Sequence, residues 1–230
     1  MTAQELSIEI AGRLNLRLRI SGQRSVPFIF HVLGPPSIGK TFLQEQLFLR
    51  WEYRKATFLQ VSSFAFSRHG RLRRCLSECA ANAYHLQRLR SALTALTRGR
   101  SVTVRIYDHL LGATCQEAMI VLRPSRLIYL EGPIWLHCSD IVSPDFTVIM
   151  LPLSLENWHA AYVHRNTRYR NYSIEQAETA FELAHQGWRD SLRLFSGRAD
   201  FTVHTDLTGP DYVPSYFIVS KSSKNEANHE

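Results

Sequence analysis

The stretch that decides the fold is VLGPPSIGKT, residues 32–41. A glycine is followed by four residues and then by Gly-Lys-Thr. In loops of this pattern the glycines let backbone N–H groups curl around phosphate oxygens, the lysine reaches the β- and γ-phosphates, and the threonine hydroxyl holds Mg²⁺. We therefore predict that eight consecutive residues bind a nucleotide: Gly34, Pro35, Pro36, Ser37, Ile38, Gly39, Lys40 and Thr41.

The sequence on either side of this loop fits the same interpretation. The apolar run VPFIFHVL (26–33) precedes it and is typical of a parallel strand with both faces covered, whereas TFLQEQLFLRWEY (41–53) follows it and predicts a helix. A helix that begins at the loop points its partial positive charge at a bound anion. We expect ATP or GTP as the ligand, together with Mg²⁺.

Further short apolar runs alternate with helical patterns. Strands are predicted at 56–61, 126–132, 146–153 and 199–205, with an alternating, β-branched run at 101–107, and helices at 72–97, 155–165 and 174–196. Residues 3–20 have helical spacing, although the alternation in LNLRLRI also permits a strand. The pattern predicts an α/β fold: a P-loop NTPase three-layer sandwich, with a parallel sheet covered by helices on both faces and a small helical lid.

The length and net charge of the chain further limit the possible domain organisation and ligands. The 230 residues suit one kinase-like domain, residues 1–220, with a lid at approximately 160–175 and a polar, disordered tail at 221–230. The charge, 27 − 20 = +7, suits phosphorylated ligands, nucleic acid or an anionic surface, and equally a solvated basic surface. The N-terminus does not resemble a signal peptide and no apolar run is long enough to span a membrane, so we expect a cytoplasmic protein.

Cysteine and histidine patterns favour structural roles. The four cysteines lack zinc-site spacing and are interpreted as buried free thiols, and the ten histidines form no pattern of metal ligands. His31 fits a satisfied core histidine, and His69 could meet an acceptor, although a solvent-exposed role is favoured. The basic run RHGRLRR lacks interleaved aromatic residues, which argues against nucleic acid. Three tryptophans, Trp135, Trp158 and Trp188, are predicted to lie in the core.

From Phe28 to Val203 the order of these features resembles the uridine kinase and phosphoribulokinase group of P-loop kinases, which also includes bacterial pantothenate kinase. RGRSVTVRIYDH (98–109) is similar to the run that ends in Tyr-Asp, so the resemblance implies that Tyr107 and Asp108 lie in the acceptor pocket. LIYLEGPIWL (127–136) is similar to the strand that ends in Glu-Gly, which implies that Glu131 lies beside the phosphate loop.

The segment HRNTRYRNYS (164–173) resembles the lid of this group. Arg165 and Arg170 match its arginines and Ser173 matches its serine, whereas three positions depart from it: Asn166, Asn171 and Tyr172. Arginines in a lid can neutralise the charge that spreads over the transferring phosphoryl oxygens.

The acceptor half of the site departs from the resemblance. Ser62 stands where the group has an aspartate that acts as base, and Gly112-Ala113-Thr114 replaces its His-x-Arg. Asp108 or Glu131 could orient an acceptor instead. Asp108 could equally cap the end of a strand, and Glu131 could hold a Mg²⁺-bound water or brace the loop.

The sequence therefore predicts an ATP- or GTP-dependent kinase that acts on a hydroxyl of a small molecule such as a nucleoside, sugar or pantothenate-like compound. Two alternatives are an antibiotic-modifying P-loop phosphotransferase and a nucleotide-binding regulatory protein without transfer activity. A homodimer is compatible with the sequence. The predicted site consists of catalytic Lys40, Asp108, Arg165 and Arg170, substrate-binding Ser62, Tyr107, Asp108 and Glu131, and magnesium-binding Thr41 and Glu131.

Overall fold

A computed structural model describes residues 1–21, 26–49, 55–195, 199–208 and 212–221. Its strands are β1 (Phe28–Leu33), β2 (Thr57–Gln60), β3 (Val102–Asp108), β4 (Ala113–Leu122), β5 (Leu127–Glu131), β6 (Phe146–Pro152), β7 (Phe201–Asp206) and β8 (Ser215–Lys221). Its α-helices are α1 (Ala3–Ile20), α2 (Lys40–Phe48), α3 (Arg68–Arg73), α4 (Leu86–Thr97), α5 (Leu155–Tyr169) and α6 (Ile174–Phe195). Short 3₁₀ helices are η2 (Val61–Phe64), η3 (Ala81–Ala83) and η4 (Pro133–Cys138).

Six of the strands form one sheet in the order β2-β5-β1-β6-β7-β8. The first five are parallel, and β8 pairs antiparallel to β7 at the edge. Every residue of β1 is buried, because this strand lies in the middle of the sheet and both its faces are covered. The predicted strand at 26–33 is confirmed, and the loop that follows it leaves the carboxyl end of the sheet, where ligands of parallel sheets bind.

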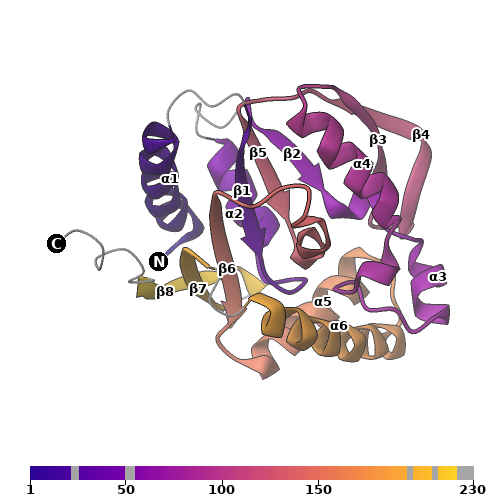
Figure 1. Cartoon of the computed structure of the whole chain (residues 1–230). Helices are drawn as coiled ribbons and strands as arrows, with labels where there is room; N and C mark the ends of the chain where they lie inside the picture. The colour runs from indigo at the N-terminus through magenta and orange to yellow at the C-terminus, as the bar shows by residue number, and fades with distance from the viewer. Residues whose placement is uncertain (22–25, 50–54, 196–198, 209–211, 222–230) are drawn as a thin grey trace.

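Two apolar clusters cover the two faces of the sheet. On one face, buried side chains of α1 and α2 such as Ile10 and Leu43 pack in the same cluster as Phe30 of β1. On the other face, Leu93 of α4 packs in the cluster that holds Ile128 of β5. Figure 1 shows α1 and α4 on opposite sides of the sheet. The predicted three-layer α/β sandwich is confirmed.

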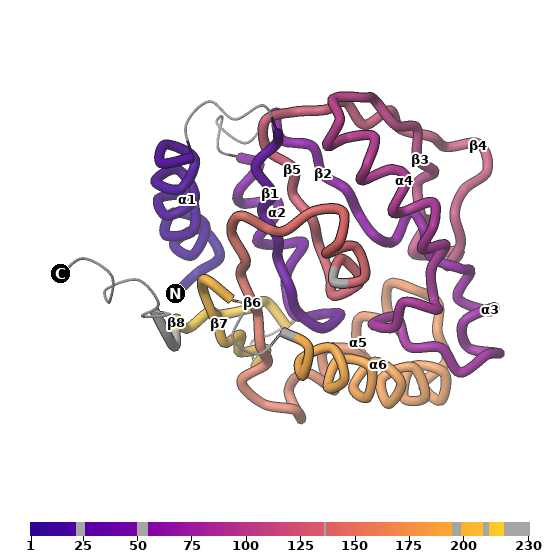
Figure 2. Tube along the Cα trace, in the orientation of Figure 1, coloured from indigo at the N-terminus to yellow at the C-terminus, as the bar shows by residue number. Residues whose placement is uncertain are grey.

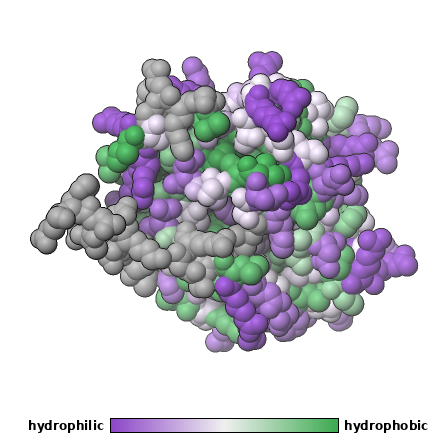
Figure 3. All heavy atoms as spheres, in the orientation of Figure 1, coloured by the Kyte–Doolittle hydropathy of each residue, from purple (hydrophilic) through white to green (hydrophobic). Residues whose placement is uncertain are grey.

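Helices α5 and α6 lie beyond the carboxyl ends of the strands (Figure 2). They pack against each other through aromatic contacts, with the rings of Trp158 and Phe181 4.9 Å apart. Trp135, Trp158 and Trp188 are all buried, as predicted. Over the arginine-rich helix α3, the face seen in Figure 3 is strongly hydrophilic.

Strand β3 does not join the main sheet. It pairs antiparallel with β4 in a separate two-stranded sheet, on the side of the molecule opposite α1 (Figures 1 and 2). The alternating run at 101–107 was therefore correctly predicted as a strand, but the end of this strand is not an end of the parallel sheet. Strands β4 and β8 were not predicted from the sequence.

The structure corrects the prediction for residues 72–97 and decides between helix and strand for residues 3–20. The predicted helix at 72–97 is wrong as one element, because the chain turns after Arg73 and Cys75 adopts a left-handed φ of 49° before α4 begins at Leu86. Residues 3–20 are a helix, whose first turn is closed by a capping box between Thr2 and Glu5. The predicted tail lies outside the described residues from 222 onward. Within the described part of the chain, no helix is long and apolar enough to cross a membrane.

Candidate functional site

The loop at 34–41 joins β1 to α2 and has the backbone that close contact with phosphate requires. Ser37 and Gly39 have left-handed φ values of 61° and 91°. A Cβ atom on Gly34 would lie 3.0 Å from the carbonyl oxygen of Met150, so only glycine fits beside β6. Trp158 of α5 donates a 2.8 Å hydrogen bond from Nε1 to the carbonyl oxygen of Pro36 and thereby fixes the outer part of the loop.

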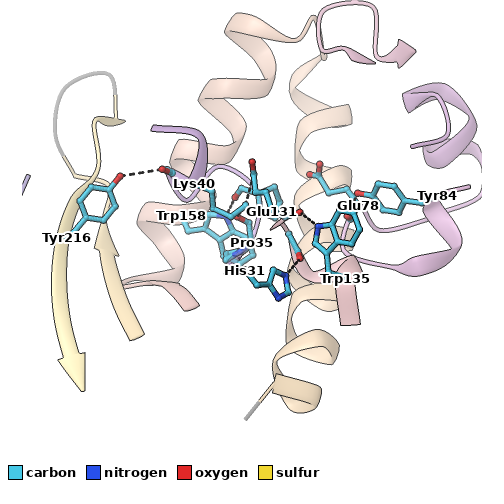
Figure 4. A network of polar contacts seen from close by, with 12 residues as sticks. His31, Pro35, Lys40, Glu78, Tyr84, Glu131, Trp135, Trp158 and Tyr216 are labelled. Atoms are coloured by element: carbon cyan, nitrogen blue, oxygen red, sulfur yellow. Dashed lines mark hydrogen bonds and ion pairs between the residues drawn. The ribbon is translucent and has the colours of Figure 1, made fainter. Parts of the chain in front are cut away.

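The Lys40 side chain is buried within this loop. Its Nζ donates to the carbonyl oxygen of Pro35 at 2.7 Å and lies 3.8 Å from Oε1 of Glu131 (Figure 4). Burial lowers the pKa of Lys40, and the negative charge of Glu131 partly opposes that effect. A buried ammonium group with one carbonyl partner and one acid beside it is well placed to bind phosphate oxygens instead.

The loop opens onto a cavity of about 560 Å³. This volume lies within the range of small-molecule sites, roughly 300–1,000 Å³. The cavity brings together most residues that were selected from the sequence, and these are Gly34, Pro36, Ser37, Gly39, Lys40, Thr41, Ser62, Tyr107, Glu131, Arg165 and Arg170. These residues come from the phosphate loop, η2, β3, β5 and α5, so side chains distant in sequence face one space.

The loop chemistry fits a nucleotide and Mg²⁺. The buried hydroxyl of Ser37 has no hydrogen-bond partner among the described residues, which leaves it available to a phosphate oxygen. Thr41 and Glu131 both line the cavity next to Lys40, and hydroxyl and carboxylate oxygens are the ligands that Mg²⁺ prefers. The described residues contain no cluster of three or more His, Cys, Asp or Glu side chains that could hold a metal by themselves. A cation here would therefore need oxygens from a bound phosphate.

Arg165 and Arg170 reach the cavity from the end of α5. Burial lowers the pKa of Arg165 to about 10, and the charge of Arg170 contributes to this shift, yet the group stays charged at neutral pH. The turn after α5 accounts for two of the residues that depart from the resembling lid. The buried Asn166 donates a 2.8 Å hydrogen bond from Nδ2 to the carbonyl oxygen of Tyr162, and Asn171 adopts a left-handed φ of 56°.

Glu78 is the acidic residue that sequence reasoning missed. It lies in the turn between α3 and η3, lines the cavity, and its Oε1 accepts a 2.7 Å hydrogen bond from the hydroxyl of Tyr162. Burial raises its pKa, but the charges of Arg71 and Arg170 and the bond from Tyr162 oppose this and the pKa is lowered overall. The carboxylate is therefore ionised at neutral pH.

A signal for Glu78 was present in the sequence. Between Glu52 and Asp108 it is the only acidic residue, in a segment rich in arginine. A lone acid among many basic residues indicates a specific partner or ligand rather than a general surface charge. The prediction of one continuous helix at 72–97 concealed this, because it placed Glu78 on an ordinary helix surface.

Asp108 was predicted to line the acceptor pocket, but its side chain is bonded within a turn instead. Its Oδ1 accepts hydrogen bonds from the backbone N–H groups of Leu110 at 2.7 Å and Leu111 at 3.0 Å, so it caps the turn of the β3–β4 hairpin. It is not among the residues that line the cavity. The structure thus favours the capping alternative, because the carboxylate of Asp108 is bonded within the hairpin turn, while its neighbours Tyr107 and His109 line the cavity. His69 is exposed on α3 and does not line the cavity either.

The structure confirms some of the remaining cysteine and histidine predictions and contradicts others. His31 is a satisfied core histidine, with Nε2 2.8 Å from the carbonyl oxygen of Gly132, and burial lowers its pKa to about 4. Cys79 and Cys138 are buried free thiols as predicted, but Cys75 is exposed and Cys115 is only half-buried. A half-buried histidine that was not selected from the sequence, His164, lines the cavity, and its Nε2 has no partner among the described residues.

Several solved structures with the same fold are described as kinases. A protein of Bacillus stearothermophilus described as a possible uridine kinase aligns over 84% of this chain and 98% of its own, with 15% identity and a TM-score of 0.58. D-glycerate 3-kinase from Cryptococcus neoformans aligns over 92% and 99%, with 13% identity and a TM-score of 0.59. Phosphoribulokinase from Rhodobacter spheroides aligns over 82% and 73%, with 16% identity and a TM-score of 0.57.

These similarities establish the fold that the chain shares with P-loop kinases. No protein-family profile and no curated protein sequence matches the chain. The chemistry of the site therefore has to be argued from its own residues.

Proposed function

We propose that this protein is an ATP- or GTP-dependent phosphotransferase that moves the γ-phosphoryl group to a hydroxyl of a small molecule. The observation that carries this proposal is the shared cavity: the phosphate loop with Lys40 and the ionised Glu78 face the same space. Two of the kinases with the same fold are named for uridine and D-glycerate, which are both small hydroxylated molecules, and this supports the proposal.

The nucleotide would be held at the loop. The backbone N–H groups of the loop and the N-terminus of α2 would bind the phosphates, and Lys40 would leave the carbonyl oxygen of Pro35 to contact them. Thr41 and Glu131 would hold Mg²⁺ directly or through water. When bound, the cation supplies positive charge that neutralises the phosphate oxygens.

The acceptor would lie on the side of the cavity where Glu78 is found. A carboxylate that is ionised at neutral pH can accept a hydrogen bond from the attacking hydroxyl and then take its proton. Glu78 would thus perform the role that the aspartate plays in the resembling kinases, where this chain has Ser62. Tyr162 holds the Glu78 side chain in place through its 2.7 Å hydrogen bond, and Ser62 and Tyr107 line the same region.

The arginines of α5 would complete the reaction. Phosphoryl transfer passes through a loose transition state, so catalysis consists mainly of positioning and of neutralising charge. Arg165 and Arg170 line the cavity that the phosphate loop and Glu78 also line, and guanidinium groups carry their charge at neutral pH. Both side chains are therefore suited to contact the equatorial oxygens of the transferring group.

Label transfer tests this proposal. The purified protein would be incubated with γ-³²P-ATP or γ-³²P-GTP, Mg²⁺ and fractions of a small-molecule extract, and products would be separated from nucleotide and inorganic phosphate. We expect an organic phosphate ester with the wild-type protein and none with Lys40→Ala. Tight binding of Mg-ATP without any labelled ester would favour the regulatory protein without transfer activity.

A further inference from the structure

A second, smaller cavity of about 40 Å³ adjoins the main one on the side of Glu78. Six residues line both cavities, namely Ser62, Glu78, Tyr84, Tyr107, His109 and Arg170. Arg68 and Arg71 of α3 also line the smaller cavity. This space is therefore an extension of the acceptor side, and three arginine side chains against one acid surround it.

Arg68 is already committed to structural contacts. Its guanidinium group donates to the carbonyl oxygens of Arg170 and His109 and lies over the ring of Tyr172, 4.2 Å from its centroid. These bonds tie α3 to the turn after α5 and to the hairpin loop. Arg68 therefore braces the walls of the small cavity, with both of its terminal nitrogens bonded to carbonyl oxygens.

Arg71 has donors left over. Its Nη2 donates to the hydroxyl of Tyr107 at 3.0 Å, but its buried Nε has no hydrogen-bond partner among the described residues. No ion pair within 4.0 Å joins it to Glu78 in the described part of the chain, although the two charges interact at longer range. A buried guanidinium donor without a partner is costly, and a bound oxyanion would satisfy it.

Arg170 also has guanidinium N–H donors for which the described residues supply few acceptors. Its side chain makes one long hydrogen bond, 3.4 Å from Nη1 to Oδ1 of Asn166, and it lines both cavities. Arg71 and Arg170 thus present two cationic guanidinium groups to the small cavity, which the carboxylate of Glu78 also lines. Glu78 and the arginines would contact different parts of one acceptor.

We infer that the acceptor carries an oxyanion, a carboxylate or a phosphate monoester, which Arg71 and Arg170 bind while its hydroxyl faces Glu78. This inference rests on the proposed function, because it names the class of molecule that the same site accepts. Guanidinium groups bind both oxyanions through paired N–H donors, so the geometry alone selects the shared chemistry. A neutral sugar or nucleoside could accept a hydrogen bond from Nε of Arg71, but it would not offset the charges of the arginines that line the small cavity.

The test uses the Arg71 side chain itself as reporter. The ¹H–¹⁵N signal of Arg71 Nε–H, assigned by its loss in Arg71→Gln, would be followed in ¹⁵N-labelled wild-type protein whose phosphate loop is filled with Mg²⁺ and a non-hydrolysable ATP analogue. Acetate and inorganic phosphate would be titrated separately, which distinguishes a carboxylate site from a phosphate site. We expect a saturable shift of this signal with at least one anion.

Variants make the assignment specific. Arg170→Gln should weaken the binding of that anion at least tenfold, and Arg71→Lys, which keeps the charge but loses the fork, should weaken it several-fold when the Arg170 signal is followed. Arg105→Gln removes the same charge from an exposed position on β3 and should leave binding unchanged. The absence of a saturable shift with either anion, or equal affinity in Arg170→Gln and wild type, would overturn the inference.

The outcome can be separated from that of the proposed function. A neutral acceptor in the label-transfer experiment would refute an anionic acceptor while leaving the kinase intact. Conversely, a saturable shift at Arg71 without any label transfer would support the anion site and count against the kinase.

Discussion

Replacing Glu78 by glutamine should remove the base that the proposed reaction needs while disturbing little else. Glutamine has the same shape and keeps an oxygen that can accept the hydrogen bond from Tyr162, now 2.7 Å long. A general base typically contributes about 10²–10⁴-fold to rate. We therefore expect the kcat for transfer to fall by this factor, which corresponds to about 2.7–5.4 kcal/mol in the activation barrier.

Binding of the nucleotide should change little, because Glu78 lies on the acceptor side of the cavity and Lys40 and Thr41 supply the phosphate contacts. Steady-state kinetics with the acceptor found by label transfer, combined with calorimetry of Mg-ATP binding, separate these effects. Glu182→Gln, an exposed change of the same type on α6, serves as the control. A Glu78→Gln enzyme with more than half of the wild-type kcat would refute the assignment of Glu78 as base.

The pH dependence of kcat/KM provides a second test of Glu78. Because Arg71 and Arg170 lower the pKa of Glu78 below its ordinary 4.5, the carboxylate is ionised over the neutral range. Its contribution to stability is complete above the pKa of the unfolded chain and is lost as the pH falls through the lowered pKa of the folded protein. We expect the acid limb of kcat/KM in the wild type to lie below pH 4.5, as measured in buffers of constant ionic strength. An acid limb well above that value would contradict this environment.

Five other substitutions test the rest of the site. Lys40→Ala should abolish detectable binding of Mg-ATP in calorimetry, because the triphosphate loses its main point charge, and unchanged affinity would refute the loop assignment. Arg165→Ala and Arg170→Ala should each lower kcat more than they weaken ATP binding, and a loss confined to the KM for ATP would make them ground-state binders. Asp108→Asn should leave kcat within about twofold and cost about 0.5–1.5 kcal/mol in urea unfolding through its turn, whereas a tenfold loss of kcat would restore it as a catalytic candidate. Trp158→Phe should cost about 1–2 kcal/mol in urea unfolding and weaken ATP binding, because the carbonyl oxygen of Pro36 loses its donor, and wild-type stability would show that this bond does not hold the loop.

The parts of the fold that could be predicted are those encoded by local patterns. The phosphate loop lies between an apolar strand and a helix, where Gly39 takes a left-handed φ of 91° and Gly34 packs against the backbone of Met150. The central strands β1, β5 and β6 are short continuous apolar runs, as expected when both faces of a sheet are covered.

The turn before α4 could not be found in this way. The apolar spacing of Leu72, Leu76 and Cys79 continues a helical period, but Cys75 takes a left-handed φ of 49° without a glycine to mark it. The backbone N–H of Leu76 then bonds to the carbonyl oxygen of Arg71 at 2.9 Å and closes the turn. Tertiary packing thus overrode the local preference for a helix.

The acceptor side depends on contacts between distant segments. Tyr162 bonds to Glu78 across 84 positions, and Arg71 bonds to Tyr107 across 36. The pairing of β3 with β4 also decides where Asp108 lies, and that pairing cannot be read from the alternation of β3 alone. The resemblance selected Tyr107, which lines the cavity, but it could not identify Glu78, because this acid lies outside the motifs on which the resemblance rests.

The most direct test is a crystal structure of the protein with Mg²⁺, a non-hydrolysable ATP analogue and the acceptor identified by label transfer. The account predicts the triphosphate at residues 34–41 in contact with Lys40, and an acceptor hydroxyl about 2.6–3.2 Å from a carboxylate oxygen of Glu78 and in line with the γ-phosphate. A nucleotide bound elsewhere, or an acceptor whose hydroxyl points away from both Glu78 and the γ-phosphate, would contradict it.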